Sequence, residues 1–83
     1  MIKITLGIDG MTCGMCEAHV NDAIRRSFPI KKVSSSHRKK ETVILTDTEI
    51  EEESLFRVIE ALGYSVLRLE KTTEIKKKFL FFR

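Results

Sequence analysis

The sequence predicts an α+β fold in which two helices cover one face of a four-stranded antiparallel sheet. Two observations predict it. Apolar residues alternate along the segments expected to be strands, and they recur at three- and four-residue steps along two segments expected to be helices. These segments follow the order strand, helix, strand, strand, helix, strand. In a chain of 83 residues, this split β-α-β order buries both apolar helix stripes against a single sheet.

The first expected strand and helix surround the only two cysteines of the sequence. Residues 2–9 alternate apolar and polar side chains, which is typical of a half-buried strand. The helix then runs from the cysteine pair to about Phe28, where Pro29 ends it. Its apolar face is expected to comprise Cys16, Val20, Ala23, Ile24, Ser27 and Phe28.

The second half of the domain begins with its weakest segment. Residues 30–37 include three consecutive serines, which have little strand preference, so we expect an edge strand here. The charged residues 38–41 make a hairpin turn, and the β-branched and apolar residues 42–46 make a stronger strand. Thr48 and Glu51 are spaced as a capping box for the next helix.

The second helix is expected over residues 51–62, with acidic residues in its first turn, where the helix dipole favours them. Gly63 closes this helix, and residues 65–70 form the last strand. The inner stripe of the helix is expected to comprise Leu55, Val58, Ile59 and Leu62.

We therefore expect one domain over residues 1–70, followed by a basic, Phe-rich C-terminal tail over residues 71–83. The phenylalanines of this tail form a large aromatic surface, which a free tail would not be expected to expose unless that surface has a function. The tail folds back on the open sheet face, forms a homodimer, contacts a membrane surface or a partner, or stays disordered, and these alternatives remain open. A further alternative is that the chain is one piece of a longer protein.

Composition excludes several classes of protein. A single local cysteine pair gives no disulfide framework and fits a reducing compartment. No apolar run approaches the roughly 20 residues of a membrane-spanning helix, and the N-terminus lacks a secretory signal pattern. We expect a cytoplasmic protein without stable membrane insertion. Fifteen Lys and Arg residues oppose twelve Asp and Glu, and the basic residues of the domain are not interleaved with aromatics, so no nucleic-acid partner is expected.

Residues 10–16, hereafter the cysteine loop, carry the chemistry. Cys13 and Cys16 lie one turn apart at the start of a helix, where partial positive charge and free N–H groups favour thiolate over thiol. Gly10 allows a sharp turn out of the strand, and Gly14 leaves the loop uncrowded. Both sulfurs can therefore face one small object above the helix N-terminus.

The number of ligands favours copper. Thiolates suit reduced copper, zinc, cadmium and mercury. A structural zinc site needs four protein ligands, and this pair supplies two unless His19, a partner or a second chain contributes. Cu(I) accepts two thiolates, so we expect Cys13 and Cys16 to hold one Cu(I) ion. A site with two protein ligands also suits transfer, because an incoming thiolate can bind before the first ones leave.

These residues resemble the heavy-metal-associated domain family, which includes small bacterial copper chaperones and the N-terminal modules of copper-transporting P-type ATPases. The run Gly-Met-Thr-Cys-x-x-Cys follows an alternating strand, and Gly63 and Tyr64 follow the second helix. The resemblance implies a ferredoxin-like βαββαβ fold with Cys13 and Cys16 as Cu(I) ligands. It also implies a metal-transporting P-type ATPase or another thiolate-bearing acceptor as the partner.

The resemblance further implies roles for residues near the pair. Met11 would pack its thioether into the core, and Tyr64 would face the site, shielding the ion and tuning its release. Met15 stands where many bacterial copper chaperones have a histidine, which is a departure from the family pattern. His19, one turn further along the helix, is either a third ligand or a surface histidine. His37 is expected to be exposed to solvent.

Two other functions stay open. A thiol-disulfide oxidoreductase would use the same loop, but a thioredoxin-like fold needs a parallel strand after the first helix, where this sequence predicts a hairpin. A sensor or regulator would bridge two copies through one metal ion and four thiolates. The sequence predicts a non-enzymatic metal-binding protein, a Cu(I) chaperone that passes its ion to an acceptor by ligand exchange.

Overall fold

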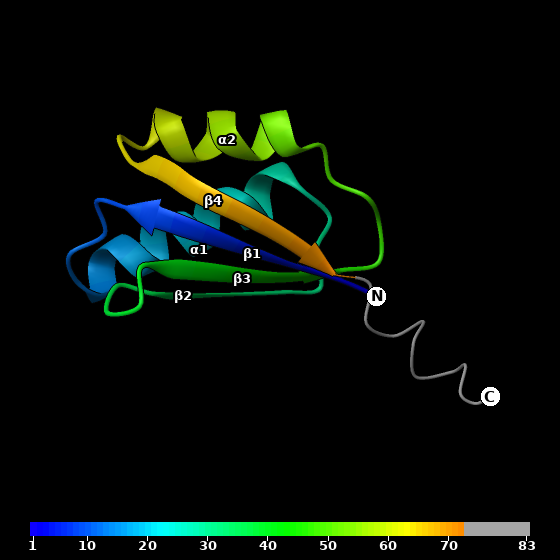
Figure 1. Cartoon of the computed structure of the whole chain (residues 1–83), viewed down its shortest axis with the longest axis horizontal. Helices are drawn as coiled ribbons and strands as arrows, with labels where there is room; N and C mark the ends of the chain where they lie inside the picture. The colour runs from blue at the N-terminus through cyan, green and yellow to red at the C-terminus, as the bar shows by residue number, and fades with distance from the viewer. Residues whose placement is uncertain (73–83) are drawn as a thin grey trace.

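The computed structural model describes residues 1–72, and the tail from residue 73 onward, with the expectations placed on it, lies outside that range. Six elements follow the predicted order (Figure 1). They are strand β1 (Ile2–Asp9), helix α1 (Gly14–Ser27), strands β2 (Lys32–Ser36) and β3 (Glu41–Thr46), helix α2 (Glu52–Ala61) and strand β4 (Ser65–Thr72). Strand β4 runs two residues past its expected end. Within residues 1–72, neither helix is long and apolar enough to cross a membrane.

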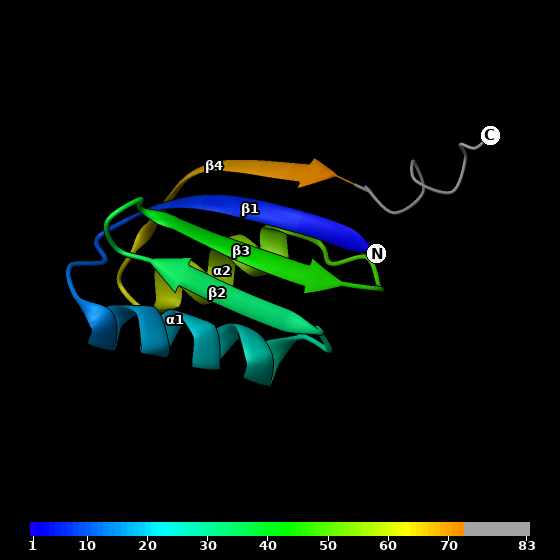
Figure 2. The same cartoon turned by 90° about the horizontal axis from the view of Figure 1, so that it is seen from below.

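The strands form one antiparallel sheet in the order β2-β3-β1-β4, with both helices on one face (Figure 2). This is the ferredoxin-like βαββαβ fold, and it confirms the predicted class. Strand β2 is an edge strand, as its serines indicated. Gly7 of β1 pairs with Glu41, the first residue of β3, and Asp9 pairs with Ser65, the first residue of β4. The cysteine loop after β1 therefore lies at the same end of the sheet as the β2–β3 and α2–β4 turns.

The core lies between the sheet and the helices. Alternate residues of the central strand β1 point into it, and both helices contribute one apolar stripe. Burial of each large apolar side chain contributes about 1.5–3 kcal/mol to folding. Ser27, predicted on the inner face of α1, is exposed because the helix ends at that residue. The side chains with less than 2% exposure are Ile4, Leu6, Ile8, Val20, Ile24, Thr42, Ile44, Thr46, Leu55 and Ile59.

Helix α2 begins later than the predicted capping box requires. Its N-cap is Glu51, which makes no side-chain cap bond, so the prediction that Thr48 and Glu51 form a capping box is wrong. Both side chains have other partners. The Thr48 hydroxyl lies 3.3 Å from the Thr46 hydroxyl, and the Glu51 carboxylate accepts a hydrogen bond from the Ser54 hydroxyl at 3.0 Å.

The end of α2 places Tyr64 beside the cysteine loop. Gly63 has a φ of +94°, and its N–H donates to the Glu60 carbonyl at 2.9 Å. The Tyr64 N–H donates to the Ile59 carbonyl at 3.3 Å. This pair of bonds around a left-handed glycine closes a helix, as predicted for Gly63. Leu62 is the C-cap residue of α2 and is 37% exposed, so the prediction that it belongs to the inner stripe is wrong.

Candidate metal centre

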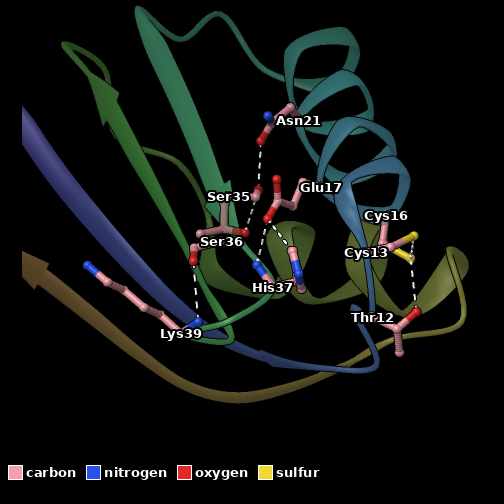
Figure 3. A network of polar contacts seen from close by, with 10 residues as sticks. Thr12, Cys13, Cys16, Glu17, Asn21, Ser35, Ser36, His37 and Lys39 are labelled. Carbon is pink, nitrogen blue, oxygen red and sulfur yellow. Dashed lines mark hydrogen bonds and ion pairs between the residues drawn. The ribbon is translucent and has the colours of Figure 1, made fainter.

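The two cysteines meet at the N-terminus of α1. Cys13 is the N-cap residue, with an extended backbone that leads the chain into the helix, and Cys16 lies in the first turn. Their Sγ atoms are 3.9 Å apart (Figure 3). Cys13 is exposed and Cys16 is half-buried, and both are free thiols. The structure therefore brings the two predicted sulfurs together at the surface.

The distance between the sulfurs fits a shared ion. A zinc–thiolate bond is roughly 2.3 Å long, so two sulfurs on one such ion lie roughly 3.8 Å apart at a tetrahedral angle and roughly 4.6 Å apart when they are opposite each other. The observed 3.9 Å lies inside this range. Both side chains could thus contact one soft ion after a small adjustment of the loop.

The helix terminus favours negative charge at this place. The N-cap side chain of α1 bonds no backbone N–H, so the first N–H groups of the helix point toward the loop without a side-chain cap. With the helix dipole they form a region of positive potential. Such a region favours the anionic form in which a cysteine binds metal.

Local donors lower the pKa of Cys16. The largest effect comes from the backbone N–H of Thr12, followed by the Tyr64 hydroxyl and then the Thr12 hydroxyl, whose oxygen lies 3.8 Å from the Cys16 sulfur. Partial burial opposes them, and the pKa falls from an ordinary value of 9.0 to about 6. The pKa of Tyr64 is raised, because its proton is held by the Cys16 sulfur. Cys16 is therefore a thiolate at neutral pH.

This pKa predicts how fast Cys16 reacts at different pH values. In a Cys13→Ser variant, Cys16 is the only thiol, and its alkylation by iodoacetamide should be half-maximal near pH 6, compared with about 8.5 for a free cysteine. Reactivity is lost as the pH falls through this value, because the thiolate becomes protonated. Adding Tyr64→Phe removes one donor and should move the midpoint upward. A midpoint near that of a free cysteine would contradict the assignment.

Gly10 and Tyr64 shape the loop together. Gly10 has a φ of +115°, and a Cβ atom there would lie 2.7 Å from Cδ1 of the Tyr64 ring. Glycine is required at this position both by its backbone angle and by the ring that covers it. A Cβ at Gly14 would meet nothing within 4 Å. The space around Gly14 is therefore open, as expected, and a residue with a side chain would also fit there.

The two methionines of the loop have different environments. Met11 is 5% exposed and packs in the core, as the family resemblance implies. Met15 is 66% exposed on the first turn of α1, between the cysteines. Its exposed thioether can contact a protein that approaches the two cysteines.

The histidines do not complete a metal site. His19 is exposed, and among residues 1–72 no group of three or more His, Cys, Asp or Glu side chains could hold an ion together. The prediction that His37 is exposed to solvent is wrong. His37 is half-buried, because its backbone N–H and ring Nδ1 contact the Glu17 carboxylate at 2.8 and 2.6 Å (Figure 3).

Sequence reasoning gave no role to Thr12 or Glu17. Thr12 lies four residues before Cys16, a separation that brings two side chains together at the start of a helix, so this signal was present in the sequence. Glu17 meets His37 across 20 residues. Nothing local in the sequence marks such a contact.

Comparison with known proteins finds similar segments in longer chains. The sequence is 33% identical over 76 residues to a mercuric reductase of Lysinibacillus sphaericus, covering 92% of this chain and 14% of the reductase. It is 32% identical over 81 residues to a copper-transporting ATPase of Helicobacter pylori, covering 96% of this chain and 10% of the ATPase. The chain thus spans a small part of these relatives. No family model matches it.

Solved structures of small metal-binding domains superimpose on nearly the whole fold. A yeast copper transporter domain, Ccc2a, studied in apo and Cu(I)-loaded states, matches with a TM-score of 0.70 and 27% identity, covering 82% of this chain and 97% of that domain. The CopZ metallochaperone matches with a TM-score of 0.72 and 21% identity, covering 78% and 98%. The N-terminal domain of ZntA in its Zn(II) form matches with a TM-score of 0.74 and 23% identity, covering 83% of this chain and 92% of that domain. The last two likenesses show the fold alone.

Proposed function

Because the chain belongs to the heavy-metal-associated domain family, we propose that it carries one Cu(I) ion between the thiolates of Cys13 and Cys16. The observation that supports this most directly is the pair of sulfurs 3.9 Å apart above an uncapped helix N-terminus. The matched Ccc2a domain comes from a copper transporter, which supports a carrier and not an enzyme. All strand pairs of residues 1–72 are antiparallel, whereas a thioredoxin-like site needs a parallel neighbour.

The ligand count supports copper over zinc. Within residues 1–72 the site offers two cysteine sulfurs and no third His, Cys, Asp or Glu side chain to complete a group of ligands. Zinc in a closed site takes four protein ligands, while soft Cu(I) is satisfied by two thiolates. One matched domain has been studied with Cu(I) bound, which agrees with this choice.

Transfer to an acceptor follows from the exposure of the site. Cys13 is exposed, so a thiolate of an acceptor can reach the ion from the solvent side and bind before Cys13 or Cys16 leaves. The acceptor we propose is a metal-transporting P-type ATPase or another protein that presents paired thiolates. We place the exchange in the cytoplasm, where thiols remain reduced.

Mercury is the second candidate cargo. Hg(II) is also a soft ion that thiolates bind, and a mercuric reductase is 33% identical to the chain over 76 residues. The geometry of the cysteine loop does not distinguish between Cu(I) and Hg(II). Under this alternative the same two sulfurs would pass Hg(II) to an acceptor with paired cysteines.

Titration of the reduced protein with Cu(I) against a competing chelator tests the proposal. We expect one tightly bound ion per chain, and sedimentation of the loaded protein should give a monomer. When a synthetic Cys-x-x-Cys peptide is added, the rate of copper release should rise with the peptide concentration, because the incoming thiolate joins the ion first. A release rate independent of the peptide would contradict ligand exchange. One ion per two chains would favour the metal-gated dimer, and preferential retention of Hg(II) would favour mercury.

A further inference from the structure

The turn between β2 and β3, residues 37–40, bonds residues that lie on both sides of the cysteine loop. On one side, the Ile8 N–H donates to the Lys40 carbonyl at 2.8 Å. On the other side, one carboxylate oxygen of Glu17 accepts the His37 backbone N–H at 2.8 Å and lies 2.6 Å from His37 Nδ1 (Figure 3). Ile8 precedes the loop and Glu17 follows it. The β2–β3 turn is thus bonded to the segment before the cysteine loop and to the segment after it.

The turn is itself well fixed. Glu41, which follows it, pairs with Gly7 of β1 on one side and Ser36 of β2 on the other. Lys40 has a φ of +57°, a region that residues other than glycine seldom adopt and keep only when their surroundings hold them there. The turn can therefore act as a rigid reference for the parts of the chain bonded to it.

The first turn of α1 needs support from outside the helix. Its N-cap side chain is that of Cys13, which faces Cys16 and bonds no backbone N–H. A helix without a side-chain cap opens most easily at that end. Glu17 follows Cys16 directly, and its carboxylate bonds this first turn of α1 to the β2–β3 turn.

We propose that Glu17 is a positioning residue, which holds the Cys16 sulfur beside the Cys13 sulfur by anchoring the first turn of α1 to His37. The inference rests on the proposed function, because it states what sets the affinity of the same site. Both side chains are largely covered, at 28% and 33% exposure. The backbone N–H of His37 donates whatever the state of the imidazole. Groups that orient metal ligands in this way typically change metal affinity 10–100-fold when they are removed.

Asn21 offers a matched control. It lies one turn further along α1, where its Oδ1 accepts a hydrogen bond from the Ser35 hydroxyl at 2.7 Å. Ser35 in turn lies 2.8 Å from the Thr42 hydroxyl. Asn21 therefore ties the same helix to the same pair of strands without touching the turn that carries Cys16.

The experiment compares Glu17→Ala, Glu17→Gln and Asn21→Ala in the full chain. The first measurement, on metal-free protein, is hydrogen exchange of the amides at positions 16 and 17, which donate to the Cys13 carbonyl at 3.1 and 3.3 Å. The second is Cu(I) retention against a chelator. We expect Glu17→Ala to speed the exchange and weaken retention by about tenfold each. Asn21→Ala should leave both nearly unchanged. Glu17→Gln keeps an oxygen that can accept the His37 N–H. This variant should therefore keep most of the exchange protection and most of the Cu(I) retention of the unaltered protein.

Two results would overturn the proposal. The first is unchanged exchange at positions 16 and 17 in Glu17→Ala. The second is an equal loss in Asn21→Ala, which would mean that any loosening of α1 has the same result. If the unaltered protein fails to retain Cu(I), the proposed function fails, and the exchange measurement still decides whether Glu17 positions the first turn.

Discussion

Replacing either Cys13 or Cys16 by serine is expected to abolish tight Cu(I) binding. A serine hydroxyl is a hard, neutral ligand that a soft ion binds poorly, and residues 1–72 offer no further His, Cys, Asp or Glu side chain that would complete a group of three ligands. Structural zinc in peptides with four ligands is bound by about 10–16 kcal/mol, or about 3 kcal/mol per ligand. Loss of one of two thiolates should therefore weaken binding at least on the order of a hundredfold.

The fold should survive both cysteine substitutions. Cys13 is exposed and Cys16 half-buried, and substitutions at such positions usually change stability little. Thermal unfolding of the metal-free variants checks the fold, and chelator competition checks binding. Met15→Ala removes a third sulfur from the same turn, one that is 66% exposed, and should keep the original affinity. Chelator-resistant copper in either serine variant would refute the site of two thiolates.

Much of the fold follows from periodicity alone. The alternation along β1 places Ile4, Leu6 and Ile8 on one face, and the structure buries all three completely. The stripe of α1 places Val20 and Ile24 in the core in the same way. These features depend on neighbours two to four residues apart, which is the range over which a sequence pattern carries direct information.

Two of the errors lie at the two ends of α2. The sequence offered Thr48 as an N-cap, but its hydroxyl contacts Thr46, and α2 starts four residues after Thr48. Leu62 fits the helical stripe, but it is the last residue before the left-handed Gly63 and stays exposed at the end of α2. Hydroxyl residues readily bond their own backbone or a near neighbour, and this competition is not visible in spacing.

The sequence predicted the two ligands of the candidate site. It did not predict the side chains that hold those ligands in place. The paired cysteines and the helix after them indicated where the sulfurs lie. The contact between Glu17 and His37 depends on how the β2–β3 turn packs against α1, so it exists only after the sheet has formed. Long-range polar contacts of this kind leave no periodic trace.

Gly10→Ala is expected to lower the stability of the domain substantially. The φ of +115° at Gly10 is unfavourable for any L side chain, and the new Cβ would lie 2.7 Å from Cδ1 of Tyr64. Backbone strain of this kind costs about 1–3 kcal/mol, and displacement of the ring adds to it. We expect a total loss of about 2–4 kcal/mol, which lowers the melting temperature of a domain this small by at least about 8 °C.

The same substitution at Gly14 provides the matched control, and the pair separates strain from chemistry. Gly14 opens α1, and a Cβ there would meet nothing within 4 Å, so Gly14→Ala should be neutral or stabilising by up to about 1 kcal/mol. Gly10→Ala should also raise the pKa of Cys16, because the displaced Tyr64 hydroxyl no longer donates to its sulfur. Thermal unfolding and the pH dependence of alkylation measure the two effects. Equal melting temperatures for the two variants would show that the ring does not pack on Gly10 in solution.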